Sequence, residues 1–392
     1  MKLSVVILSL ASLVFAASLR TFEQQPLPAA QSGFDLDLNA FRLIQLEGRA
    51  PEWVTEGRKA GHPPWSHIEL KALGFKFFDI TENQDLGNGI QSPTRVKSSF
   101  PSPNATEKVT PILKTLSTQG PKENLEKFTS FRTRYYRSDT GRASQKWLLS
   151  KICEITNGTA SASLQKLITF REFRHSWGQN SIIVRIQGSS TSDDAVVIIG
   201  AHQDSTNLWP FLPAPDDGSG SVTILEAYRA LLAADYRPVR TLEFHWYSAE
   251  EGGLLGSQAV AQDYAANSVN VIAMSQFDMT AWVKRGTREE AGIIIDYVDP
   301  DLTKFNMELV DLYMDIPFVQ TQCGYACSDH ASWRKAGYAS TFTIESSFEN
   351  SNKNIHSAND RIDISDEFSF EHMLEFSKLA VAFAVELGGY TD

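Results

Sequence analysis

One strand constrains the fold of this chain more than any other feature. Residues 195–200, Ala-Val-Val-Ile-Ile-Gly, form an uninterrupted apolar run with four β-branched side chains. Such a run is typical of a strand at the centre of a sheet that is covered on both faces. Apolar segments at 181–187, 241–247, 269–277 and 340–344 have a similar character and are separated by segments of helical periodicity. This alternation predicts an α/β fold in which helices cover both faces of a mostly parallel central sheet.

Helical periodicity is strong in several of the intervening segments. Apolar residues recur at helical spacing from Thr106 onwards, after Gly220, in 302–314 and in 365–387, where the last helix is expected to close the chain. We also expect a strand at 291–298. Together these elements predict a single domain with one continuous sheet.

Composition excludes several classes of function. The chain has 392 residues, of which 42% are hydrophobic, so a packed core is expected. Its net charge of −11 argues against a nucleic-acid partner, because phosphate binding needs clustered Lys and Arg. Beyond the N-terminus no apolar run is long enough to span a membrane. We therefore expect a soluble monomer that binds neither nucleic acid nor membrane.

The N-terminal part of the chain differs from the remainder. Residues 1–17 combine one basic residue with a short apolar run and small residues, the pattern of a secretory signal peptide. We therefore expect a secreted, extracellular protein. Residues 18–88 are interpreted as a propeptide, and a proline-containing stretch at 93–103 as its linker to the enzyme body, residues 89–392. The alternative is an ordinary N-terminal subdomain.

Cysteines and sequons agree with export. Asn104-Ala-Thr and Asn157-Gly-Thr are potential N-glycosylation sites. Cys323 and Cys327 are close enough in sequence to pair in an oxidising compartment, and we favour this disulfide over a metal site. Cys153 is expected to be a buried free thiol.

Two acidic or histidine-containing segments follow predicted strands. His202 follows the 195–200 strand, and although such a histidine is often only hydrogen-bonded, Asp204 can accept its second N–H and orient the ring for a metal. Asp216 and Asp217 lie in a glycine-rich loop, where one of them could simply cap a helix. Two adjacent carboxylates repel each other unless a cation or a cap takes one up. We assign Asp216 to a metal and Asp217 to local support.

A second acidic pair follows the strand at 241–247. Glu250 and Glu251 offer one carboxylate for a metal and another to take a proton from water. Asp278 ends another strand, and His356 lies in a polar loop. Each alone would more often be structural, but two histidines with three carboxylates suit a pair of Zn²⁺ ions.

Two other interpretations remain open on these residues. His330 is a possible substitute ligand. A serine nucleophile is the weaker one, because Gly218-Ser-Gly-Ser lacks the form of a Gly-x-Ser-x-Gly elbow.

These motifs occur in a known order. The segments at 202–205, 216–220, 248–253, 276–279, 323–333 and 354–360 resemble, in sequence, those of the M28 family of secreted zinc aminopeptidases. The likeness is greatest to the fungal leucine aminopeptidases that are made as precursors. It covers about residues 99–392, and residues 72–81 also resemble part of their propeptide. The family resemblance implies a zinc-exopeptidase-like catalytic domain at 89–392.

The resemblance also implies roles for individual residues. Asp216 would bridge two zinc ions, His202 and Asp278 would complete one site, and Glu251 and His356 would complete the other. Glu250 would be the general base, and the peptide bond between Asp216 and Asp217 would be cis.

The implied substrates are peptides with a free N-terminus. Met279, Tyr325, Phe348 and the Cys323–Cys327 disulfide would line a pocket that favours leucine or another apolar first residue. The propeptide would be a partner that guides folding or covers the site, as in a zymogen. The alternatives are a single-zinc enzyme similar to glutaminyl cyclase and a non-catalytic domain of the same fold.

Overall fold

The computed structural model describes residues 39–46, 50–56, 77–84, 100–206 and 215–391. The predicted signal peptide at 1–17, most of the predicted propeptide and residues 93–99 of the linker predicted at 93–103 lie outside the described residues.

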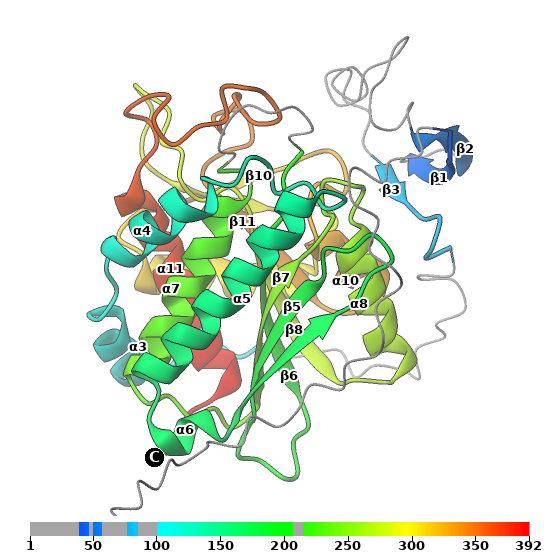
Figure 1. Cartoon of the computed structure of the whole chain (residues 1–392). Coiled ribbons are helices and arrows are strands. Elements are labelled where there is room, and N and C mark those ends of the chain that lie inside the picture. Colours follow the sequence, from blue (N-terminus) through cyan, green and yellow to red (C-terminus); the bar gives the residue numbers. More distant parts are fainter. Residues whose placement is uncertain (1–38, 47–49, 57–76, 85–99, 207–214, 392) are drawn as a thin grey trace, which may run out of the picture. The chain divides into compact units, whose positions relative to one another are not determined.

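An eight-stranded sheet forms the body of the protein (Figure 1). Its central pairs β11–β8, β8–β6 and β6–β7 are parallel, as is β10–β9, whereas β9–β11, β7–β5 and β5–β4 are antiparallel. The prediction of a mostly parallel central sheet is therefore confirmed. In spatial order the strands are β10 (Phe318–Thr321), β9 (Ala291–Ile294), β11 (Ser340–Ile344), β8 (Val271–Phe277), β6 (Val196–His202), β7 (Thr241–Tyr247), β5 (Ser181–Ile186) and β4 (Ile168–Phe173).

Helices cover both faces of this sheet, as predicted. In Figure 1, α5, α7 and α11 lie on one side of the strands, and α8 and α10 lie on the other. The helices are α3 (Thr106–Leu113), α4 (Gln119–Phe128), α5 (Asp139–Thr159), α6 (Ala162–Gln165), α7 (Gly218–Ala233), α8 (Leu255–Ala266), α9 (Pro300–Tyr313), α10 (His330–Lys335) and α11 (Phe370–Gly388).

The central strand β6 explains why both faces need cover. Val197 and Ile199 point into one apolar core, which they share with α5, α7 and α11, whereas Val196 and Ile198 point into a second core with α8 and α10. All four side chains are buried, and each contributes about 1.5–3 kcal/mol through burial. A strand that alternates its side chains between two cores is apolar along its whole length.

The register of the central strands places their carboxyl ends level with one another. His202 at the end of β6 is opposite Tyr247 at the end of β7, and Gly200 is opposite Gln276 of β8. The segments that follow these three strands therefore emerge at one edge of the sheet, where open α/β sheets place their ligand sites.

Gly220 allows α7 to begin directly against this edge. A Cβ atom there would lie 2.3 Å from the main-chain oxygen of Phe277 and 2.5 Å from the carboxylate of Asp217. Only glycine fits such a close approach of helix and strand. The first turn of α7 is thereby fixed beside the end of β8.

The N-terminal region forms a small antiparallel sheet of its own in the order β2 (Glu52–Thr55), β1 (Phe41–Leu46), β3 (Phe77–Asp79). β3 lies within residues 72–81, the segment that resembles part of the propeptide of the fungal enzymes, whereas β1 and β2 were not predicted.

The last helix and two edge-side strands differ from expectation. The last helix begins at Phe370 and not near residue 365, because Ser369 accepts the N–H of His372 as its N-cap. The strand predicted over 291–298 ends at Ile294. The edge strand β10 was missed because four residues give too short a pattern. Among the described residues, no helix combines the length and apolar character required to span a bilayer.

Candidate metal centre

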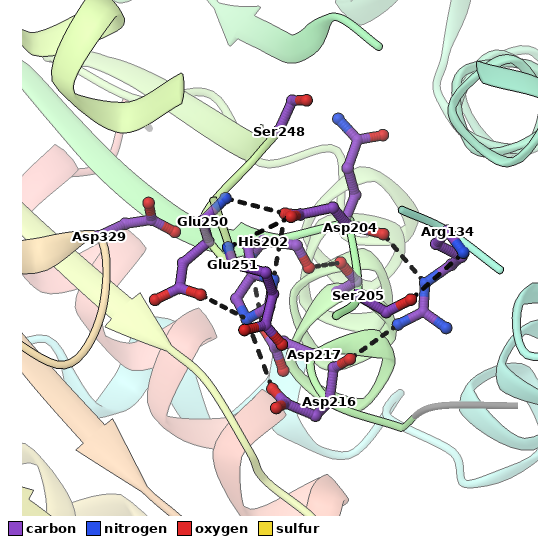
Figure 2. Close-up of polar contacts among 12 residues, drawn as sticks. Arg134, His202, Asp204, Ser205, Asp216, Asp217, Ser248, Glu250, Glu251 and Asp329 are labelled. Carbon is purple, nitrogen blue, oxygen red and sulfur yellow. Dashed lines mark hydrogen bonds and ion pairs between the residues drawn. The ribbon is translucent and has the colours of Figure 1, made fainter. Parts of the chain in front are cut away.

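The candidate ligands meet at the carboxyl edge of the central sheet, where Figure 2 shows His202, Asp216, Glu250 and Glu251. His202 is the last residue of β6, Glu250 and Glu251 follow β7, and Asp278 follows β8. Asp216 lies just before α7. Segments far apart in the sequence are thus gathered by the strand order.

One group of ligand atoms surrounds the imidazole of His202. Its Nε2 lies 3.5 Å from Oδ1 of Asp216 and 3.5 Å from Oδ1 of Asp278. Oε2 of Glu250 is slightly farther from the same nitrogen, at 3.8 Å. Oδ1 of Asp278 is buried and makes no hydrogen bond among the described residues.

A second group surrounds His356, which comes from the loop after β11. Its Nε2 lies 2.9 Å from Oδ2 of Asp216 and 3.2 Å from Oε1 of Glu251. The two carboxylate oxygens of Asp216 therefore face different histidines. A carboxylate in this position can bridge two cations.

These separations fit zinc. Ligand atoms about 2.0–2.1 Å from one tetrahedral ion lie about 3.3 Å apart, close to the distances around both histidines. Asp216, Glu251 and Asp278 are buried, as is His202, while His356 is part-buried. Among the described residues, two clusters of His, Cys, Asp or Glu could hold an ion; one contains His202 and Asp278, and the other contains Asp216, Glu251 and His356.

Asp217 also lies within reach of the first cluster, but its carboxylate is already used. Oδ1 accepts the N–H groups of Gly220 (2.7 Å) and Met279 (3.1 Å), and Oδ2 accepts the N–H of His202 (3.2 Å). Both oxygens thus hold main chain around the site. We therefore favour Asp216 over Asp217 as the ligand, although proximity alone would group Asp217 with His202.

Asp204 connects the end of β6 to the segment that follows β7. Its Oδ1 lies 3.4 Å from Nδ1 of His202 and accepts the N–H of Glu250 at 3.0 Å. Its Oδ2 accepts the N–H of Glu251 at 3.2 Å. A carboxylate on the second ring nitrogen fixes the orientation of a ligating histidine.

The surrounding charges favour a bound cation. Burial opposes protonation of His202, but the carboxylates of Asp278 and Glu250 outweigh it and raise the pKa of His202 well above its ordinary value. Burial also raises the pKa of Asp329 to about 7. A field that stabilises positive charge on a ligand histidine would equally stabilise a metal ion, which competes with the proton.

The backbone adopts unusual conformations beside several ligands. The peptide bond between Asp216 and Asp217 is cis, as the resemblance implied. Ala249, Met279 and His356 have φ values of 58°, 58° and 57°, in the left-handed region. Non-glycine residues in that region are uncommon, and they gather at functional sites where the surroundings enforce them.

Comparison with known proteins identifies the family. Residues 181–381 match Peptidase family M28. The chain is also 49% identical over 364 residues to "Leucine aminopeptidase 1" of Colletotrichum graminicola, a match that covers 89% of this chain and 86% of that protein. The chain belongs to peptidase family M28.

Other similar proteins agree with an aminopeptidase. "Leucine aminopeptidase 1" of Neurospora crassa is 48% identical over 358 residues, covering 88% of this chain and 85% of that protein. The crystal structure of the LapA aminopeptidase of Legionella pneumophila has a TM-score of 0.72 and 31% identity, covering 83% of this chain and 88% of that one. The predictions of the family and of an aminopeptidase, a hydrolase of peptide bonds, are confirmed.

An apolar cluster of this M28 peptidase includes neighbours of two candidate ligands, Met279 beside Asp278 and Ile355 beside His356. Met279, Tyr325 and Phe348 belong to it, together with the disulfide between Cys323 and Cys327. The predicted disulfide is present. The rings of Tyr325 and Phe348 stand nearly perpendicular, with centroids 6.2 Å apart. Their role as a substrate pocket stays a prediction.

The predictions for Cys153 and His330 need revision. Cys153 is free but only part-buried. His330 is buried, packs against Phe342 and belongs to neither metal cluster of the described residues; burial lowers its pKa to about 3. His330 is therefore a core residue and no substitute ligand.

Several supporting residues were not recognised from the sequence. Ser328 donates to Oδ2 of Asp278 at 2.7 Å, and Oδ2 of Asp329 accepts from Nε2 of Gln276 at 3.2 Å. The signal that could have found Ser328 and Asp329 was their place within the family-like segment 323–333. Arg134 and Asp360 also contact the site. Asp360 closes the segment 354–360 that resembles the family, whereas Arg134 left no recognisable pattern.

Proposed function

We propose that this protein is a secreted dizinc aminopeptidase that removes N-terminal residues, preferably leucine or another apolar residue, from peptides. The observation that carries the proposal is the position of Asp216, whose two carboxylate oxygens face His202 and His356 at 3.5 and 2.9 Å. Family membership supplies the reaction class.

The chain offers a complete set of ligands for two ions. His202 and Asp278 would hold one zinc, Glu251 and His356 would hold the other, and Asp216 would bridge them. The spacing of these atoms supports this assignment. Zinc ions held there would lower the pKa of a water and polarise the carbonyl group of the scissile bond.

Glu250 is the proposed general base. Its carboxylate lies at the same site, with Oε2 3.8 Å from Nε2 of His202, and its main-chain N–H is fixed by Asp204. It would take a proton from the attacking water and return it to the leaving amine. A carboxylate of this kind contributes about 10²–10⁴-fold to the rate.

The apolar cluster supports the choice of substrate. The side chain of the first residue would contact Met279, Tyr325 and Phe348, whose apolar surface favours leucine over charged residues. The free α-amino group would lie among the carboxylates of the site, which explains why only a terminal residue is removed. The relatives named leucine aminopeptidases agree with this preference.

The N-terminal part is proposed to act before maturation. Residues 1–17 would direct secretion, and 18–88 would be a propeptide that is removed to leave the enzyme at 89–392. The separate small sheet β2-β1-β3 supports a propeptide with some structure of its own. Asn104 and Asn157 would carry glycans. Equal activity of the precursor and the trimmed enzyme would argue against a covering role for the propeptide.

A single-zinc enzyme of the glutaminyl cyclase type is less well supported. It needs only one ligand group, whereas here His356 and Glu251 form a second group around Asp216. A non-catalytic domain of this fold would require neither ligand group.

The test is Glu250→Gln, which keeps the size of the side chain and removes its basicity. We expect the variant to bind two zinc ions per chain and to lose about 10²–10⁴-fold in kcat on leucyl-p-nitroanilide. The control is Glu126→Gln, at an exposed position on α4. Full activity of Glu250→Gln would exclude Glu250 as the base, and one zinc per wild-type chain would exclude the dizinc site.

A further inference from the structure

We infer that Arg134 is a positioning residue that, together with Asp360, holds in register the loops carrying the metal ligands. The inference rests on the proposed dizinc site. Arg134 lies between α4 and α5 and takes no part in the chemistry proposed above.

The guanidinium group joins two ligand-bearing loops. Its Nε donates to the main-chain oxygen of Gln203 at 3.0 Å, and its Nη2 donates to the main-chain oxygen of Asp216 at 3.0 Å (Figure 2). Gln203 directly follows His202. The two carbonyl groups that the guanidinium connects thus belong to the neighbour of one proposed ligand and to the proposed bridging ligand itself.

The main chain of Arg134 is fixed to the loop after β6 and to the turn between β4 and β5. Its N–H donates to Oγ of Ser205 at 3.2 Å, and its carbonyl oxygen accepts from Nε2 of Gln179 at 3.0 Å. The guanidinium carbon lies 4.6 Å from the centroid of the Phe128 ring. Arg134 is 1% exposed, so its side chain has little freedom to move.

Asp360 holds the main chain of Asp216 at its other polar group, the N–H. Its Oδ2 accepts the N–H of Asp216 at 3.2 Å. Asp360 lies four residues after His356, so this bond joins the second histidine's loop to Asp216. Both main-chain polar groups of the proposed bridging ligand are therefore held by buried side chains, and the loops of His202, Asp216 and His356 are linked.

Two properties of arginine suit this place. Its planar fork can donate in fixed directions to two carbonyl groups at once, which the single ammonium of lysine cannot match. The guanidinium is also permanently charged, and this charge lies among the carboxyl groups of Asp204, Asp216, Asp217 and Asp360. The arrangement keeps the ligands in place by geometry as well as by charge.

The experiment compares Arg134→Lys with the wild-type protein. Lysine retains the charge but loses the fork. We expect zinc to bind about 10–100-fold more weakly, as for other residues that orient metal ligands, in competition with a fluorescent chelator. The visible spectrum of the cobalt(II)-substituted variant should also change. Arg132→Lys is the matched control, because Arg132 is exposed and two residues away.

The outcomes separate this inference from the proposed function. A wild-type protein that binds no zinc would overturn both the proposed dizinc function and the role of Arg134. If the wild type binds two zinc ions and Arg134→Lys binds them equally tightly, with the same cobalt spectrum, only the role of Arg134 is overturned, even if the variant melts earlier.

A second variant covers the case in which Arg134→Lys does not fold. Asp360→Ala removes the acceptor of the Asp216 N–H and should weaken zinc binding about tenfold. Unchanged zinc affinity in that variant would overturn the inference.

Discussion

Asp204 offers the most direct test of how the site is supported. The carboxylate is fully buried, accepts the N–H groups of both Glu250 and Glu251, and lies 3.4 Å from Nδ1 of His202. The substitution Asp204→Asn keeps the shape of the side chain. It replaces one acceptor oxygen by an NH₂ group, which must then face one of these donors.

The loss can be estimated from the bonds. One hydrogen bond to a charged acceptor contributes about 1.5–3 kcal/mol, and the variant loses at least one of the two. For a domain of this size, about 2 °C of Tm accompanies each kcal/mol, so the zinc-free variant should melt about 3–6 °C lower. Because the orientation of His202 also changes, zinc affinity should fall about 10–100-fold.

The assay combines thermal unfolding of the zinc-free protein with chelator competition for zinc. Asp311→Asn, at an exposed position on α9, is the matched control and should change neither quantity. A Tm within 1 °C of the wild type (a margin of about 0.5 kcal/mol) and an unchanged zinc affinity would show that Asp204 does not support the site, and the argument from its three contacts would be wrong.

Two further predictions concern the apolar cluster and the pH dependence of stability. Phe348→Ala should raise KM for leucyl-p-nitroanilide about 5–30-fold with a smaller effect on kcat, because about 1–2 kcal/mol of apolar contact is lost; an equal rise for alanyl-p-nitroanilide would contradict the role of Phe348 in binding leucine. Asp329 has a folded pKa raised to about 7 from 3.8, so its stabilising contribution is complete below pH 3.8 and is lost as the pH rises to about 7. Asn at this position does not ionise. In urea titrations of the zinc-free proteins, the free energy of unfolding of Asp329→Asn should therefore rise relative to that of the wild type between pH 5 and 8. A pH-independent difference would refute this.

Much of the fold followed from local patterns. The apolar run that became β6 predicted a central strand with both faces covered, and its end predicted the place of His202. Short or edge elements such as β10 and β1 were missed, because a few residues carry too little periodicity. The start of α11 was misplaced because it depends on the cap at Ser369.

The site shows the same division. Strand ends indicated which histidines and carboxylates could meet, since parallel strands present their carboxyl ends at one edge. The sequence could assign Asp216 and Asp217 different roles but gave no geometric reason. The reason is tertiary: Asp217 is used by the N–H groups of His202, Gly220 and Met279, which leaves Asp216 facing both histidines.

The sequence by itself determined the central strands and the main helices that cover them, because these depend on side-chain periods of two and 3.6 residues, and with them the residue types at the strand ends. Only the tertiary structure decided that Arg134 and Asp360 hydrogen-bond to the main chain of Asp216, from positions 82 and 144 residues away in the sequence. Such contacts depend on how distant loops pack against one sheet edge, and no local period encodes that packing.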